Sequence, residues 1–146
     1  MPPTPDDLIK AIKPGAVLFL KNVFPDSKKP HHHVLLNYPL GEDKDIAALN
    51  ASTSIKGVRD MYGNKPRCLS ALIESNTCPD TPFLIEPSIF DCNKPQIFSK
   101  IKLLEMYENG DWNFDRLSAV TDDFKQKLID ALLAGTGPQI IKNLFL

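Results

Sequence analysis

Short apolar runs separated by turn residues dominate the first third of the chain. Three of them, over residues 16–20, 31–37 and 46–55, predict strands. Each is too short for a helix and is bounded by proline, glycine or polar residues. Their close spacing along the chain predicts a meander of three neighbouring strands.

The middle of the chain predicts a loop followed by more strands. Residues 56–65 are polar and contain several breakers, which is typical of an exposed loop. Extended segments are predicted over 69–73, 83–90 and 97–104. We expect 83–90 to lie at an edge of the sheet, because Pro87 cannot donate a hydrogen bond to a neighbouring strand.

Helical signals stand at the two ends of the chain. Thr4 can cap a short helix over residues 4–12, and Thr121 can cap a longer one that Gly135 would end. The apolar positions of the longer helix recur at every fourth residue, at Phe124, Leu128 and Leu132. A last short helix is predicted from Pro138 onward, so that the C-terminal part is helical over 121–146.

This order of elements predicts one domain over residues 1–146, mainly β with α. The strands would form a small barrel or strongly bent sheet over 14–105, capped by the C-terminal helix. A net charge of −1 argues against a surface coated with basic residues. Three cysteines without a C-x-x-C pair predict reduced thiols, and no stretch is apolar enough for a membrane span. We expect a soluble, cytoplasmic protein that makes no contact with membranes.

The three histidines of the chain are consecutive, His31 to His33, and follow Lys28 and Lys29. Histidine changes charge near neutral pH, so this cluster is the best candidate for chemistry. Side chains alternate along a strand, which places His31 and His33 on one face and His32 on the other. Two interpretations stay open: at least one histidine is catalytic, or one is a hydrogen-bonded core residue and the others are solvated.

A metal site is the alternative use of these residues. His31 and His33 could approach one ion from the same face of the strand. Zinc sites need a third or fourth ligand, and no second histidine or cysteine pair stands at suitable spacing. The sequence therefore predicts neither a metal site nor a cofactor.

Several motifs together resemble the PemK/MazF family of toxin endoribonucleases. They are the opening strand PGAVLFL at 14–20, Lys29-Pro30 ahead of the strand VLLN at 34–37, the pair Thr53-Ser54 after the third strand, and the segment 82–92, which is similar to one found in an uncharacterised branch of these proteins. The resemblance implies an SH3-like barrel with a C-terminal helix, cleavage of single-stranded RNA without metal, a homodimer and a cognate antitoxin.

The resemblance also suggests which residues act on RNA. Family members carry an arginine before the proline of the second strand, and Lys29 or His31 stands in its place here. The implied catalytic residues are His31, His32 and Thr53, and the implied RNA-binding residues are Lys28, Lys29, Ser54 and Arg59. The alternative function is a non-catalytic SH3-like module that binds nucleic acid or a protein.

Overall fold

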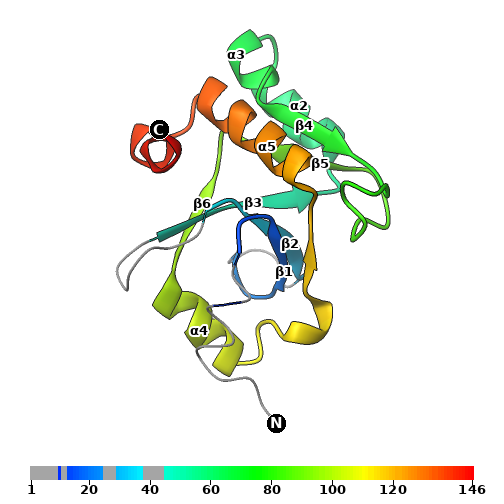
Figure 1. The fold of residues 1–146 in the computed structure, drawn as a ribbon. Helices are drawn as coiled ribbons and strands as arrows, with labels where there is room; N and C mark the ends of the chain where they lie inside the picture. The colour runs from blue at the N-terminus through cyan, green and yellow to red at the C-terminus, as the bar shows by residue number, and fades with distance from the viewer. Residues whose placement is uncertain (1–9, 11–12, 25–28, 38–44) are drawn as a thin grey trace.

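The computed structural model describes residues 10, 13–24, 29–37 and 45–146. The fold is mixed α/β, with a curled antiparallel sheet that forms half a barrel and carries helices on both faces (Figure 1). The strands are β1 (Ala16–Leu20), β2 (His31–Leu35), β3 (Asp45–Ser52), β4 (Leu72–Ser75), β5 (Ser88–Asp91), β6 (Gln96–Ser99) and β7 (Ser118–Ala119). The helices are α2 (Ile55–Tyr62), α3 (Pro66–Leu69), α4 (Lys100–Glu108), η1 (Phe114–Arg116), α5 (Asp122–Ala134), α6 (Gln139–Lys142) and η2 (Asn143–Phe145).

The predicted meander of the first three strands is confirmed. Strand β2 lies between β1 and β3, with Val34 opposite Val17 on one side and Leu49 on the other. The far edge of β3 is shared, because β6 pairs with its first half while β5 pairs with Ala51 and Ser52 at its end. The sheet order is therefore β4-β5-β3-β2-β1-β7, with β6 beside β3.

Along each strand of the meander, successive side chains lie alternately in two different hydrophobic cores. Val17 and Val34 lie in the core beneath α5, whereas Leu18 and Leu35 lie in the core on the opposite face, beneath α4. Because both faces of the sheet are covered, its strands carry continuous apolar runs. The first core also receives the predicted stripe of α5, whose members Phe124, Leu128 and Leu132 are all buried.

The prediction of a loop over 56–65 is wrong, because most of this segment is helix α2. Ile55, Val58 and Tyr62 pack together against β4 and β5 in a third core cluster. Their spacing of three and then four residues is helical. The breaker Gly57 and the polar residues between them concealed that pattern, because the stripe is narrow.

The segment 97–104 is a strand only in its first part. Strand β6 ends at Ser99, whose side-chain oxygen accepts a hydrogen bond from the backbone N–H of Lys102 at 3.0 Å. This capping bond starts helix α4, because serine satisfies an N–H that the first turn leaves without a partner. The prediction that the sheet continues to residue 104 is therefore wrong.

The other two extended segments also differ in detail. Helix α3 occupies the start of 69–73, and β4 begins at Leu72. Of 83–90, only the last part is a strand, which begins after Pro87. The prediction of an edge strand is wrong, since β5 lies between β4 and β3.

The C-terminal helices agree with the sequence. The Thr121 hydroxyl accepts a hydrogen bond from the Phe124 N–H at 3.3 Å, and the Gly135 N–H donates to the Ala131 carbonyl at 3.0 Å where α5 ends. Helix α6 follows Pro138, as predicted. The predicted helix over 4–12 lies outside the described residues, apart from Lys10.

Two further predictions concern the whole chain. All three cysteines are free thiols, with Cys68 and Cys92 buried. Burial and the neighbouring Asp91 carboxylate raise the pKa of Cys92 to about 12, so this thiol stays protonated. Within the described part of the chain, no helix combines the length and the apolar character needed to cross a bilayer.

Candidate functional site

A groove of about 410 Å³ opens where the ends of β2 and β3 meet the segment before β5 and the short helix η1. Five separate parts of the chain contribute to it. Its lining consists of Phe19, residues 29–32, residues 51–54, residues 83–86 together with the nearby Ser88, and Arg116. The groove therefore brings together Lys29, His31, His32, Thr53 and Ser54, all of which the sequence singled out.

The alternation along β2 is confirmed, since the rings of His31 and His33 both lie against Phe24, whereas that of His32 lies against Phe19 and Phe83. Burial divides the histidines differently. His31 and His32 are half-buried and line the groove. His33 is completely buried, packs edge-on against Phe98 and has its Nδ1 3.0 Å from the His31 carbonyl oxygen. His33 is thus a hydrogen-bonded core residue, and only the other two can meet a ligand in the groove.

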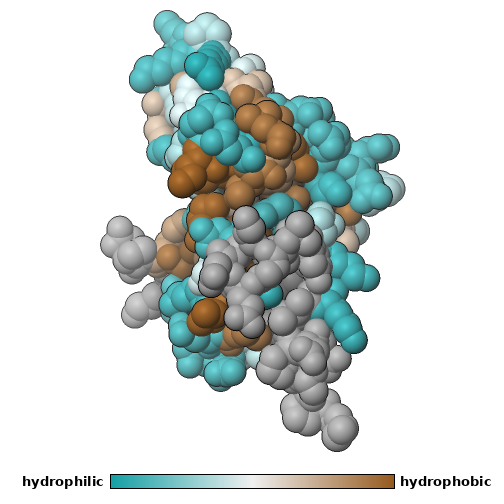
Figure 2. All heavy atoms as spheres, turned by 60° about the vertical axis from the view of Figure 1, so that its left-hand side comes forward, coloured by the Kyte–Doolittle hydropathy of each residue, from teal (hydrophilic) through white to brown (hydrophobic). Residues whose placement is uncertain are grey.

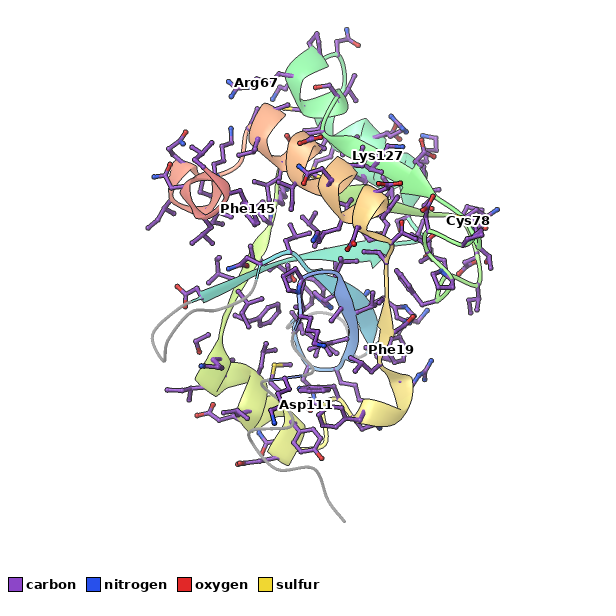
Figure 3. All side chains as sticks on the ribbon, viewed as in Figure 1. Phe19, Arg67, Cys78, Asp111, Lys127 and Phe145 are labelled. Carbon is purple, nitrogen blue, oxygen red and sulfur yellow. The ribbon has the colours of Figure 1, made fainter. Side chains whose placement is uncertain are left out.

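His32 is held between two aromatic rings. Its ring centroid lies 4.4 Å from that of Phe19 and 4.9 Å from that of Phe83. The Arg116 guanidinium lies 3.9 Å from the centroid of the Phe19 ring. Figure 3 shows Phe19 on the side of β1 that faces η1 and β7. These contacts place a cation and an imidazole next to each other along one wall of the groove.

The surroundings of His32 keep its imidazole uncharged at neutral pH. Burial, followed by the charges of Arg116 and His31, lowers the pKa of His32 to about 4. For His31, burial and the Lys29 ammonium lower the pKa below its ordinary value. A neutral imidazole carries a nitrogen lone pair, so His32 offers a proton acceptor beside the positive charges of Lys29 and Arg116.

Thr53 and Ser54 lie at the junction of β3 and α2. Strand β3 ends at Ser52, which is held opposite Ile89 of β5. Both following residues are exposed, and the Ser54 side chain forms no capping hydrogen bond to α2. Their hydroxyl groups are therefore available to a ligand in the groove.

The cations divide into those that line the groove and those that do not. Lys29 and Arg116 line it. Arg59 does not, because it lies within α2 and its guanidinium pairs with the Glu74 carboxylate of β4. Lys28 lies outside the described residues.

Arg116 is a groove cation that the sequence did not reveal. It belongs to η1, far along the chain from the histidines, and no local pattern marks it. Only the pairing of β7 with β1 brings this segment beside Phe19, since Ser118 lies opposite Val17. From the sequence alone, Arg116 cannot be distinguished from the other exposed cations of the chain.

No cluster of three or more histidine, cysteine, aspartate or glutamate side chains that could hold a metal ion occurs among the described residues. The pair considered for metal binding, His31 and His33, is divided between the groove and the core. The side chains that line the groove are instead suited to binding an anion and moving a proton.

Acid is expected to destabilise the fold through His33. Burial lowers the pKa of His33 to about 4, whereas in the unfolded chain it titrates near 6.5. The unfolded state therefore binds more protons between these values, and this residue's contribution, on the order of 3 kcal/mol, is lost as the pH falls from about 6.5 through 4.

Urea unfolding from pH 7.5 to 4 measures this effect. The variant His33→Phe should lose less unfolding free energy as the pH falls through this window. Part of the pH dependence should remain, because the pKa of His32 is also lowered to about 4. Equal pH dependence in the wild type and the variant would mean that the buried imidazole does not control acid stability.

Comparison with known proteins does not assign the chain to a family: no protein-family model matches it, and no curated protein is significantly similar to it.

Proposed function

We propose that this protein is a metal-independent endoribonuclease of the PemK/MazF kind, which cuts single-stranded RNA in the groove. The observation that carries the proposal is the meeting of Lys29, His31, His32, Thr53 and Arg116 in one groove, although they come from separate segments. Cleavage by an RNA 2′-hydroxyl requires a base, an acid and donors for the phosphate. The groove has a residue for each of these roles.

In the proposed reaction, the neutral His32 accepts the proton of the attacking 2′-hydroxyl. The new bond joins this oxygen to phosphorus, and the bond from phosphorus to the 5′ oxygen breaks. The negative charge of the bound phosphate favours the protonated form of His31, which donates a proton to the leaving oxygen. The products are a 2′,3′-cyclic phosphate and a 5′-hydroxyl, so no metal, oxidant or further reactant is consumed.

The cations and hydroxyl groups of the groove would bind the phosphate. Lys29 and Arg116 supply positive charge, and a bound phosphate would offset their lowering effect on the histidine pKa values. Thr53 and Ser54 supply hydroxyl donors at the start of α2. The N-terminal end of a helix also carries a partial positive charge, which favours an anion there.

The fold is compatible with this proposal. A three-stranded meander within a curled sheet, followed by a C-terminal helix, supports the interpretation of the domain as an SH3-like barrel. The homodimer and the antitoxin rest on the sequence resemblance alone. Size-exclusion chromatography with light scattering tests the first of these two expectations.

The experiment that tests the function uses purified protein, end-labelled single-stranded RNA and excess EDTA. We expect cleavage to continue and to give 2′,3′-cyclic phosphate ends. The variant Lys127→Ala, in which an exposed cation of α5 is removed, serves as the control and should cut at the wild-type rate.

Other outcomes would assign the protein differently. RNA that is bound but never cut would identify the groove as a non-catalytic nucleic-acid-binding module. Cleavage that EDTA abolishes and that zinc or magnesium restores would indicate a metal-dependent hydrolase. Either result would refute the proposed reaction.

A further inference from the structure

We propose that the segment 83–86 forms a nucleobase subsite beside the phosphate position, and that the carboxylate of Glu86 makes this subsite prefer guanine. The inference rests on the proposed RNA-cleaving function and adds the identity of the preferred nucleotide. It starts from three features of the segment: its anchored backbone, its apolar surface and its negative charge within a groove that carries cations.

The backbone of this segment is fixed on both sides of the exposed residues. Leu84 is buried, its N–H donates to the Thr81 carbonyl at 3.2 Å and its carbonyl accepts from the Thr77 hydroxyl. The Ser88 hydroxyl donates to the Glu86 carbonyl at 3.2 Å. These bonds hold the backbone on both sides of residues 85 and 86, so the two residues stay at the groove.

The apolar surface comes from Phe83 and Ile85. The Phe83 ring rests on His32, which joins the segment to the wall that includes Phe19. Ile85 is 93% exposed, more than any other large apolar side chain of the described residues, and it also lines the groove. Large apolar side chains reach the surface elsewhere too (Figure 2), but this one adjoins an aromatic wall. Bases of single-stranded RNA stack on surfaces of this kind.

Glu86 gives the subsite its selectivity. Its side chain is exposed at the groove, and it forms no ion pair with any residue that the structure describes. A carboxylate repels the phosphate that Lys29 and Arg116 attract, so it favours RNA binding only where it meets a hydrogen-bond donor.

Guanine presents the donors that suit a carboxylate best. Its N1–H and N2–H lie side by side and can meet both oxygens of Glu86. Adenine and cytosine offer one exocyclic amino group each. Uracil offers a single N–H between two carbonyl oxygens, which the carboxylate repels. The expected order of preference is therefore guanine first and uracil last.

The experiment measures the binding of four short 2′-O-methyl oligonucleotides, which lack the attacking hydroxyl and cannot be cut by this mechanism. Each consists of uridines with one central guanosine, adenosine, cytidine or uridine. By fluorescence anisotropy, the wild type should prefer the guanosine oligonucleotide over the all-uridine one by roughly 5- to 150-fold, the range for a bidentate base contact.

The variant Glu86→Gln should bring this preference close to unity, because an amide donates and accepts at the same time. The matched control is Glu108→Gln, an exposed glutamate at the end of α4 that is not part of the groove, and it should leave the preference unchanged. The thermal melting temperature verifies that both variants are folded.

Two other results would distinguish a failure of the guanine subsite from a failure of the proposed function. If the wild type binds all four oligonucleotides equally, or if Glu86→Gln strengthens all of them by the same factor, the guanine subsite is refuted while RNA binding stands. If the wild type binds none of the four and also fails to bind or cut unmodified RNA, the proposed function is refuted and the subsite with it.

Discussion

Replacing His32 by alanine is expected to lower the rate of RNA cleavage roughly 10²- to 10⁴-fold, the usual contribution of a general acid or base. His32 lies between the rings of Phe19 and Phe83, and with a pKa of about 4 its imidazole is unprotonated at neutral pH. Alanine removes the acceptor while the phosphate-binding cations remain. The same range is expected for His31→Ala, because the leaving oxygen would lose its proton donor.

Single-turnover cleavage at saturating protein measures this effect without interference from weaker binding. Lys29→Ala provides the contrast, since it should weaken binding and reduce the slope of log affinity against log salt by roughly 0.7, as expected for one lost contact to a single strand. Arg59→Ala should change the affinity less, because Arg59 is paired with Glu74 outside the groove. Cleavage at the wild-type rate in both histidine variants would refute the catalytic assignment.

Replacing Leu128 by alanine is expected to lower the free energy of unfolding by about 2 to 5 kcal/mol, the cost of emptying a large side chain from a packed core. Leu128 is completely buried on the inner face of α5. It shares its core with Val17 and Val34 of the meander. The helix therefore contributes to the same hydrophobic core as the strands whose ends form the groove.

The midpoint of urea unfolding measures this change. The preceding residue, Lys127, is exposed on the same helix, and Lys127→Ala should shift the unfolding free energy by no more than about 0.5 kcal/mol. This pair separates the loss of packing from a change in helix propensity. An unchanged midpoint for Leu128→Ala would show that α5 does not stabilise the domain.

The meander and α5 could be predicted from the sequence because their signals are local. Pro14 and Gly15 bound the continuous apolar run of β1, and Thr121 and Gly135 bound the periodic stripe of α5. Helix α2 was missed for a physical reason. A short helix that packs only one narrow face needs few apolar residues, and tertiary contacts stabilise it despite Gly57.

The candidate site could be predicted only in part. Lys29, His31 and His32 are consecutive or nearly so, and Thr53 follows the strand that pairs with theirs, so local pattern and resemblance reached them. Arg116 required knowledge of the sheet order, because β7 brings it to β1 from a distant part of the chain. Whether Arg59 would enter the groove also depended on a partner, Glu74, that no sequence spacing reveals.

The short strand β2 places a limit on engineering this protein. Its second half supplies two fully buried apolar residues, Val34 and Leu35, while its first half supplies the two histidines of the groove. A search for thermostable variants would favour apolar replacements at the half-buried His32, because they avoid the cost of desolvating an imidazole. Such variants would gain stability by giving up the proposed chemistry, so a stability screen on this strand needs an activity screen beside it.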